Sequence, residues 1–393
     1  MKVLAAAIVP PHMDVSGGLR AAIALSTALV PHCSIELARL AKEDGRSCVG
    51  GLPIRDVKAR LPLNGLVGRM PNKVRTPLYR SALPDCVTEK LDLVHLHNPM
   101  PTLEMARVAK RCLELDKPYA VSTHGFVEVA SDGSSYGLGP TGRLAWRFLV
   151  TRPLRYVAAN ASRVLALSPA EFPLLAELGV PEKKIDVVPN GIDLPAVLAP
   201  GIREATRSRL GIPPRDGRPR ALFLANHTRN KGLPVLIEAM LETRLPFVLL
   251  AGGSPRAEID YDAWLRRCGP DQEILFTGFV TDEEVSVLFE EADFFAFPTL
   301  ADTYPLAVLE ALAHGKPVLA SRVGGIPYQV DEDRGRLIEP GDVAAWRQAL
   351  ADVLGDGASL SRLTEGARAS AGSCYSWENA ASSALDVYRK ILS

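Results

Sequence analysis

Two carboxylates flank a proline in the segment Phe297–Gly325, and their spacing is the feature of this sequence best suited to chemistry. Asp302 and Glu310 are eight positions apart, with Pro305 between them, and the segment closes with an apolar run and two glycines. Pro305 favours the first position of a helix because its missing N–H would be unpaired there anyway. Asp302 would then lie in the loop and Glu310 about one and a half turns into the helix. Both carboxylates can face a ligand whose anionic part binds the free amides of the helix start.

The same spacing has a plainer interpretation, in which Asp302 caps the helix and Glu310 is a surface residue. If both face a ligand instead, one loop and one helix start can hold a diphosphate, a sugar hydroxyl and a ribose. Carboxylates suit this task because they accept hydrogen bonds from neighbouring hydroxyls. Spacing alone leaves both interpretations open.

Short apolar strands alternate with helical patterns along the whole chain, which is typical of βαβ units with a parallel sheet. Two capping boxes mark helix starts, Ser168 with Glu171 and Thr281 with Glu284. The predicted strands are Val3–Val9, Leu93–Leu96, Tyr119–Thr123 and Val164–Leu167 in the first half, and Ala221–Ala225, Phe247–Ala251, Ile274–Thr277, Phe294–Pro298 and Pro317–Ala320 in the second.

A turn-rich segment, Val187–Gly201, follows the first set of these units, and we place a hinge there. The sequence therefore predicts an α/β fold of two doubly wound domains, residues 1–195 and 196–375. A C-terminal helix, residues 376–393, is expected to cross back to the first domain. Such domains bind ligands at the carboxyl ends of their strands, on a shared cleft.

Composition describes an ordinary globular chain of 393 residues, 47% of them hydrophobic, with a formal net charge of zero. The six cysteines are scattered without a C-x-x-C pair, so neither a zinc site nor a disulfide framework is indicated, and a reducing cytoplasm fits best. The amino terminus is too short and too lightly charged for a signal peptide. No window approaches the ~20 continuous apolar residues of a spanning helix, so we expect no integral membrane segment.

Glycine motifs narrow the class of ligand. Neither G-x-G-x-x-G nor G-x-x-x-x-G-K-[ST] occurs, which argues against a dinucleotide dehydrogenase and a P-loop enzyme. Gly17 and Gly18 follow the first predicted strand and open a helix, where a bare backbone approaches phosphate or sugar closely. Packing explains such a pair equally well.

Further motifs occur in a fixed order along nearly the whole chain. They are SGGLRAA (16–22), DLVHLHNP (92–99), STHG (122–125), VVPNGID (187–193), NKG (230–232), AGG (251–253), TGFV (277–280), and LEALAHGKPV followed by VGGIP. With the Asp302–Glu310 segment they resemble the retaining glycosyltransferases of the group 1 family, which includes glycogen and sucrose synthases and many bacterial polysaccharide enzymes. The resemblance implies the GT-B fold, two Rossmann-like domains facing across a cleft. It also implies that residues 1–195 bind the acceptor and residues 196–375 bind the nucleotide-sugar donor.

This resemblance also implies an activity: retaining transfer of a hexosyl group from a UDP- or GDP-linked sugar to a saccharide or lipid-linked acceptor, in polysaccharide or glycoconjugate biosynthesis. No metal or other cofactor is implied, and no nucleic acid. Two alternatives remain: a sugar-nucleotide-binding protein of the same fold with little or no activity, and an epimerase or phosphorylase.

The family's site residues map onto this sequence by motif. His124, Lys231 and Asp302 would act at the reacting sugar, and Glu310 would bind the ribose. The donor-binding set would be Gly17, Gly18, Asn226, Arg229, Lys231, Gly252, Val280, Asp302, Tyr304, Pro305, Leu306 and Glu310. We interpret His12, His95 and His97 as structural.

This sequence departs from the family pattern at three of these motifs. The first acid of the pair is Asp302 rather than Glu. Asn226 stands where the family has an arginine, and either Arg229 replaces that arginine or Arg229 is a solvated loop residue. Tyr328 replaces the usual glutamate after G-G-x-P, which puts any role of that glutamate in doubt.

Charge is uneven along the chain: residues 1–200 hold 24 basic and 18 acidic residues, and the remainder 21 and 27. One basic stretch comprises Arg55, Lys58, Arg60, Arg69, Lys73, Arg75 and Arg80, and a second comprises Arg143, Arg147, Arg152, Arg155 and Arg163, interleaved with Trp146, Phe148 and Leu149. Basic and aromatic residues together favour peripheral contact with an anionic membrane, on the inner face of the cell membrane. A solvated face on an enzyme with a small acceptor is the alternative.

Overall fold

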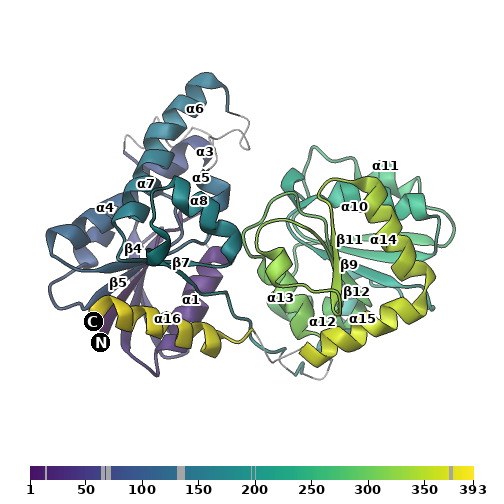
Figure 1. The fold of residues 1–393 in the computed structure, drawn as a ribbon. Helices are drawn as coiled ribbons and strands as arrows, with labels where there is room; N and C mark the ends of the chain where they lie inside the picture. The colour runs from purple at the N-terminus through teal and green to yellow at the C-terminus, as the bar shows by residue number, and fades with distance from the viewer. Residues whose placement is uncertain are drawn as a thin grey trace. The chain divides into compact units, whose positions relative to one another are not determined.

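The structure is a computed structural model that describes residues 1–13, 16–62, 67, 72–130, 138–195, 197–199, 201–370 and 375–393. The chain divides into two compact units (Figure 1). Unit 1 comprises Met1–Gly191 and Trp377–Ser393, and unit 2 comprises Ile192–Ser376. The sequence placed the boundaries after residues 195 and 375.

Unit 1 is built on an eight-stranded sheet with the order β3-β4-β2-β1-β5-β6-β7-β8. All its neighbouring strands are parallel except the hairpin β3–β4. The strands are β1 (Lys2–Ala7), β2 (Ser34–Ala41), β3 (Gly45–Val49), β4 (Leu52–Lys58), β5 (Leu93–His97), β6 (Tyr119–Ser122), β7 (Arg163–Ala166) and β8 (Ile185–Val187). The described helices are α1 (Gly17–Leu29), α3 (Asn72–Arg75), α4 (Thr102–Glu114), α5 (Phe126–Ala130), α6 (Pro140–Trp146), α7 (Arg152–Asn160), α8 (Phe172–Glu177) and α16 (Trp377–Leu392).

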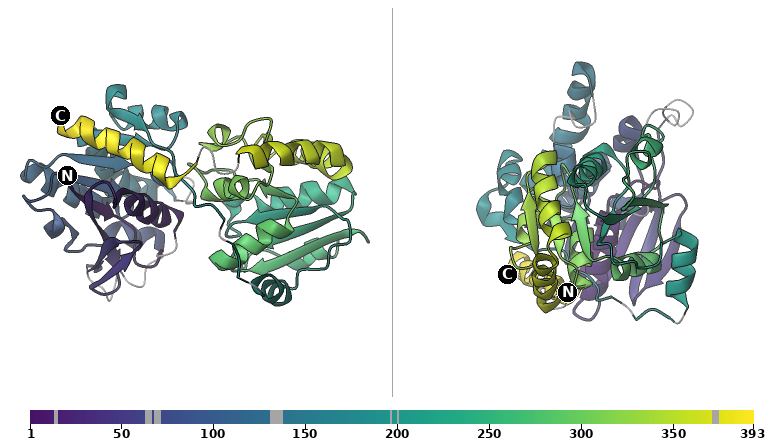
Figure 2. Two further views of the ribbon diagram at one scale, coloured as in Figure 1. Left: turned by 90° about the horizontal axis from the view of Figure 1, so that it is seen from below. Right: turned by 90° about the vertical axis from the view of Figure 1, so that its right-hand side faces the viewer.

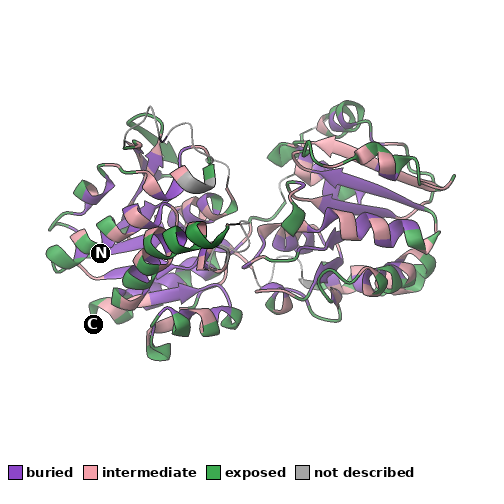
Figure 3. Cartoon of the chain, turned by 90° about the horizontal axis from the view of Figure 1, so that it is seen from above, coloured by how far each residue is buried: buried purple, intermediate pink, exposed green. Residues whose placement is uncertain are grey.

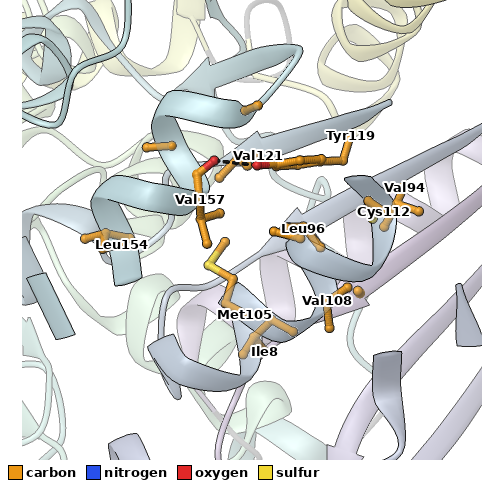
Figure 4. Packing of buried hydrophobic residues seen from close by; sticks show 14 of the residues in the cluster. Ile8, Val94, Leu96, Met105, Val108, Cys112, Tyr119, Val121, Leu154 and Val157 are labelled. Atoms are coloured by element: carbon orange, nitrogen blue, oxygen red, sulfur yellow. Dashed lines mark hydrogen bonds between the residues drawn. The ribbon is translucent and has the colours of Figure 1, made fainter. Parts of the chain in front are cut away.

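The core of unit 1 forms where α4 and α7 cover its sheet. β5 is buried at all five positions, and Met105 and Val108 of α4 pack against it with Leu154 and Val157 of α7 (Figure 4). The hydroxyl of buried Tyr119 donates to Val157 O at 2.8 Å, so the phenol is satisfied inside the core.

α16 returns the end of the chain to unit 1, where it packs along α1 (Figures 1 and 2). Tyr388 of α16 is fully buried, and its hydroxyl lies 2.7 Å from His95 Nδ1 on β5. A polar contact between residues this far apart in sequence fixes the helix to the sheet.

Unit 2 is built on a six-stranded parallel sheet with the order β11-β10-β9-β12-β13-β14. Hydrophobic clusters line both faces of the sheet, so its inner strands are buried and its helices are exposed on their outer sides (Figure 3). The strands are β9 (Arg220–Leu224), β10 (Phe247–Gly252), β11 (Gln272–Gly278), β12 (Phe294–Phe297), β13 (Val318–Ser321) and β14 (Gly335–Ile338). The helices are α9 (Ile202–Leu210), α10 (Leu233–Thr243), α11 (Tyr261–Leu265), α12 (Asp282–Glu291), α13 (Leu306–Ala313), α14 (Val343–Gly355) and α15 (Gly357–Ser370).

Every strand expected from the sequence is present, within two residues at each end, and β2, β3, β4, β8 and β14 were not predicted. The Thr281–Glu284 capping box at α12 is confirmed. The Ser168–Glu171 box is wrong, because the Ser168 hydroxyl makes no cap bond and is buried without a partner. Glu171 turns inward instead and accepts from Leu167 N at 2.6 Å.

None of the helices in the described part of the chain combines the length and the apolar character that a membrane crossing needs.

Candidate functional site

The carboxyl edge of the unit 2 sheet gathers most of the residues predicted to bind a donor. Asn226 follows β9, Gly252 ends β10, Val280 follows β11 and Asp302 follows β12. Because all these strands are parallel and neighbouring, the loops that follow them emerge at one edge.

Hydrogen bonds tie these loops to one another. Ser254 N donates to the Asn226 side chain at 3.4 Å, which links the loops after β10 and β9. Asn230 O accepts from Leu300 N at 2.7 Å and from Thr299 Oγ1 at 3.1 Å, which links the loop after β9 to the loop after β12. The loops that carry Lys231 and Asp302 are therefore held in one fixed arrangement.

Lys231 and Asp302, 71 positions apart in sequence, form an ion pair with Nζ 2.7 Å from Oδ2. Their side chains are 22% and 12% exposed, so the pair is screened from bulk water while remaining reachable. The ammonium also lies 5.7 Å from the centroid of the Phe297 ring. An anion that enters here meets a cation that is paired with the Asp302 carboxylate.

Helix α13 begins beside this pair. The sequence predicted Pro305 at the first helical position, whereas in the structure Pro305 is the N-cap and the half-buried residues Leu306 and Ala307 begin the first turn. Glu310 lies on the second turn and is half-buried. Tyr304 is buried before the helix, and burial raises the pKa of its phenol. The helix start therefore offers unpaired N–H groups and a positive dipole end to an anion.

Two glycines allow neighbouring backbone segments to approach each other closely at this edge of the sheet. Gly324 has a φ of 50°, and a Cβ placed there would lie 1.9 Å from Asp302 O. Gly232 has a φ of 72°, and its Cβ would lie 1.9 Å from Pro298 O. Gly324, the first of the two glycines that close the segment Phe297–Gly325, is thus needed for close approach to the backbone of Asp302. The sequence carried this signal in its V-G-G and N-K-G motifs, but not the identity of the opposing carbonyls.

Apart from Asp302, the residues at the motifs that depart from the family pattern lie in exposed positions. Arg229 is exposed in the turn that carries Lys231, and no partner is recorded for its guanidinium within the described ranges. Asn226 is also exposed. Tyr328 is 51% exposed, and its carbonyl accepts from the Tyr375 hydroxyl at 3.4 Å.

In unit 1, a second group of predicted residues lies at the carboxyl ends of β1, β5 and β6. Gly17 and Gly18 open α1, which Ser16 caps by accepting from Leu19 N at 3.3 Å. A Cβ at Gly18 would lie 2.0 Å from Asn98 Nδ2 and 3.6 Å from His124 Cβ, whereas one at Gly17 would meet nothing within 4 Å. Gly18 is therefore required by packing, and Gly17 presents open backbone.

His124 belongs to a row of buried histidines. Its ring stacks on His97 with centroids 5.8 Å apart, and His97 lies 3.9 Å from His95. His95 bonds to Ser122 Oγ at 2.8 Å as well as to Tyr388. Burial lowers the pKa of His95 to about 3 and that of His124 to about 4, and it places the pKa of His97 well below its usual value. All three rings are therefore neutral at pH 7.

Glu171 supports the strand end that carries His124. Its side chain is buried and accepts from Thr123 Oγ1 at 2.8 Å, directly before His124, and from Leu167 N on the neighbouring strand. Burial raises the pKa of this carboxyl from 4.5 to about 7. From the sequence we predicted only a capping role for Glu171, and not its hydrogen bonds with Thr123 and Leu167.

A pH-dependent stability follows from Glu171. The pKa of this carboxyl is about 7 in the folded state and 4.5 in the unfolded state. Between these two pH values the folded state binds more protons than the unfolded state. The free energy of unfolding therefore declines as pH rises from 4.5 to about 7. Between about pH 5 and pH 8, the free energy of unfolding of Glu171→Gln should decline by about 3 kcal/mol less than that of wild type. Urea unfolding at a series of pH values measures this difference. Glu177→Gln, at an exposed position on α8, should leave the decline intact. Equal pH dependence in wild type and Glu171→Gln would show that the buried carboxyl is ionised when folded.

Within the described ranges, no group of three or more His, Cys, Asp or Glu residues is arranged to hold a metal ion.

Family models match both units. A model of "Glycosyl transferases group 1" matches residues 218–356, and a model of "Glycosyltransferase Family 4" matches residues 43–195. The two matches cover different parts of the chain, and each lies almost wholly within one unit.

Among curated proteins, the chain is similar to a D-inositol 3-phosphate glycosyltransferase of Xylanimonas cellulosilytica, with 33% identity over 59% of this chain and 57% of that protein. The counterpart from Nocardia farcinica is 34% identical over 61% of this chain and 54% of that protein. The chain thus spans just over half the length of these relatives. A 2-deoxystreptamine glucosyltransferase of Streptomyces kanamyceticus is 28% identical over 87% of this chain and 89% of that protein.

Solved structures share the fold of this chain. A sucrose-phosphate synthase from Thermosynechococcus elongatus aligns with a TM-score of 0.71 at 18% identity, over 100% of this chain and 99% of that one. Anabaena HepE, solved in complex with UDP and glucose, aligns with a TM-score of 0.71 at 17% identity, over 99% and 100%. With the two parallel-sheet α/β units, these similarities establish the GT-B fold that the sequence predicted.

Proposed function

The chain belongs to the group 1 glycosyltransferases, and from this membership we propose that it transfers a hexosyl group, with retention, from a nucleotide diphosphate sugar to a saccharide or lipid-linked acceptor. The observation that carries the proposal is the Lys231–Asp302 pair beside the start of α13. It puts a cation, free helix amides and a carboxylate within one small region, and these are the groups that a sugar diphosphate needs.

In this proposal the diphosphate of the donor binds Lys231 and the first amides of α13, which neutralise the charge of the leaving group. Asp302 accepts hydrogen bonds from hydroxyls of the transferred sugar, and Glu310 accepts them from the ribose. Backbone groups near Val280 contact the base. His124 serves the reacting sugar as a neutral imidazole, because burial keeps its pKa near 4.

The reaction breaks the bond between the anomeric carbon and the diphosphate oxygen and forms a bond from that carbon to the acceptor oxygen. The acceptor's proton passes to the departing phosphate on the same face of the sugar, which preserves the anomeric configuration. No protein nucleophile is required, so the contribution of the site is positioning and charge neutralisation.

The solved relatives support a nucleoside diphosphate as the donor's leaving group. Anabaena HepE was solved with UDP-glucose, and a starch synthase from Arabidopsis thaliana was solved with ADP and acarbose. The curated relatives act on cyclitol-type acceptors according to their names, inositol phosphate in one case and 2-deoxystreptamine in another. The sugar and the acceptor of this chain are open to direct assay.

The test is incubation with UDP-, GDP- and ADP-linked hexoses, with and without candidate acceptors, followed by detection of the released nucleoside diphosphate. Acceptor-dependent release and an anomeric configuration in the product that matches the donor, read by NMR, are expected. Donor turnover without a second substrate would indicate an epimerase. Tight donor binding without any turnover would indicate the sugar-nucleotide-binding alternative.

Arg229 supplies a second phosphate-binding cation in this proposal, in place of the arginine absent at Asn226. Arg229→Ala should weaken the binding of a nucleoside diphosphate by about 10-fold or more, because a charged hydrogen bond contributes ~1.5–3 kcal/mol. Calorimetric titration measures this, with Arg347→Ala on α14 as the matched exposed control. An affinity within about twofold of wild type would make Arg229 a solvated loop residue.

A further inference from the structure

An exposed apolar and basic face runs along the helical segment 140–156 of unit 1. The segment comprises α6, a π-helical turn (Arg147–Thr151) and the first part of α7. Its inner side packs into the core through Trp146, Val150 and Leu154. In Figure 1, α6 stands away from the sheet of unit 1.

Large apolar side chains occupy this outer side. Leu144 is 58% exposed and Phe148 is 53% exposed, and their spacing of four residues makes them neighbours along the helix. Tyr156, farther along, is 39% exposed. The core needs none of these side chains, because the opposite side of the helix already packs into it. Exposed apolar side chains that cluster in this way indicate a contact surface.

Arginines surround these apolar residues without acidic neighbours in sequence. Arg143, Arg147, Arg152 and Arg155 are all exposed, and residues 138–170 contain no Asp or Glu. No ion pair is recorded for Arg143, Arg147 or Arg152 in the described part of the chain, and Arg155 donates only to the Glu177 carbonyl, at 3.1 Å. The face therefore carries a local positive charge that the described residues do not neutralise.

Two residues that the sequence analysis counted in the basic stretch, Trp146 and Arg163, do not belong to the exposed face in the structure. Trp146 is 4% exposed and donates its indole N–H to Val129 O, so it is a core residue rather than an interfacial one. Arg163 lies on β7, where it donates to Lys183 O at 2.7 Å and pairs with Asp186.

Two residues of the earlier basic stretch are neutralised by ion pairs. Arg55 pairs with Glu36 at 2.9 Å, and Lys58 pairs with Glu43 at 2.6 Å. Arg69 and the side chain of Lys73 lie outside the described residues. Arg60 and Arg80 are exposed without an ion pair in the described part of the chain, but segment 140–156 is where exposed arginines accompany exposed large apolar side chains, Leu144 and Phe148.

We propose that this face, formed by Arg143, Leu144, Arg147, Phe148, Arg152, Arg155 and Tyr156, docks on an anionic lipid surface. Phe148 and Leu144 enter the interface between headgroups and acyl chains, while the guanidinium groups bind lipid phosphates. An anionic bilayer satisfies both parts of the face at once, since it offers dense negative charge directly above an apolar layer. The proposal is independent of the donor site, because lipid binding requires neither nucleotide nor acceptor.

Co-sedimentation of the full-length chain with vesicles tests the proposal. Binding is expected to vesicles of phosphatidylcholine with phosphatidylglycerol, weakened by added salt, and not to phosphatidylcholine alone. The double variant R143Q/R147Q should bind about 30-fold more weakly, from roughly fivefold for each near-surface charge. L144S/F148S should also lose binding. R266Q/R347Q, which removes two exposed arginines of unit 2, should bind as wild type does.

Three results would overturn the proposal: no binding at low salt, equal binding to neutral vesicles, or wild-type binding by R143Q/R147Q. A fourth would be self-association of the protein that L144S/F148S abolishes in the absence of vesicle binding, because a second copy of the chain would then cover the face. Nucleoside diphosphate affinity, measured on each variant, separates loss of folding from loss of lipid binding. If the donor assay fails while vesicle binding behaves as expected, the proposed function alone is wrong.

Discussion

Replacing Lys231 by methionine lowers kcat/KM for sugar transfer by about 10- to 150-fold, which corresponds to loss of a charged hydrogen bond of ~1.5–3 kcal/mol. Methionine keeps an unbranched apolar stem beside Phe297 while removing the charge that faces Asp302. Nucleotide affinity should fall because Lys231 contacts the diphosphate of the bound nucleotide. Turnover should fall as well, because the diphosphate gains negative charge in the transition state and Lys231 would neutralise it.

Asp302→Ala should act differently from Lys231→Met. Asp302 is the counter-ion of Lys231 in the structure and the proposed partner of the transferred sugar. Its removal should lower kcat while leaving nucleoside diphosphate affinity unchanged or higher, because the Asp302 carboxylate no longer competes with the diphosphate for Lys231. Steady-state kinetics and calorimetric titration of both variants measure this separation.

Lys110→Met, at an exposed lysine of α4 that pairs only loosely with Glu114, is the matched control and should retain wild-type kinetics. Circular dichroism on all three variants checks folding, because each change in the pair removes one partner of a screened ion pair. Wild-type nucleotide affinity and turnover in Lys231→Met would contradict a phosphate-binding role.

Gly324→Ala should lower kcat/KM by on the order of 100-fold, although the residue carries no functional group. Its φ of 50° is a strained conformation for alanine, and the new Cβ would lie 1.9 Å from Asp302 O. The loop that carries Asp302 must therefore move, and small displacements of positioning groups have large kinetic effects.

Gly211→Ala is a control for backbone strain alone. Gly211 has a φ of 68°, and a Cβ there would meet nothing within 4 Å. Both variants should lose about 1–2 kcal/mol of stability from strain, but only Gly324→Ala should lose activity. Equal kinetic effects in the two variants would mean that the close approach to Asp302 is irrelevant to the site.

Much of the sheet framework could be predicted, because buried parallel strands have continuous runs of apolar residues in the sequence. β10 is buried at every position and is flanked by helical patterns, so its position followed from sequence alone. β2 was missed because Glu36 and Arg39 interrupt its apolar pattern. The β3–β4 hairpin was missed although Gly50 and Gly51, both with positive φ, are a strong two-residue turn signal.

Site residues were harder to assign, because their partners are distant in sequence. Asp302 and Glu310 could be singled out by their spacing around Pro305, but the pairing of Asp302 with Lys231 depends on how β9 and β12 lie side by side in the sheet. The inward orientation of Trp146 likewise depends on how its helix packs near Val129, which composition does not encode.

Crystals of the protein soaked with UDP or with GDP provide the most direct measurement of where a nucleotide binds. The structure predicts that the diphosphate of at least one of them contacts Lys231 Nζ and the first amides of α13, with the ribose hydroxyls at Glu310. A nucleotide bound elsewhere, or crystals at saturating UDP and GDP in which the Lys231–Asp302 pair stays intact and no nucleotide is bound, would contradict the assignment of unit 2 as the donor-binding domain.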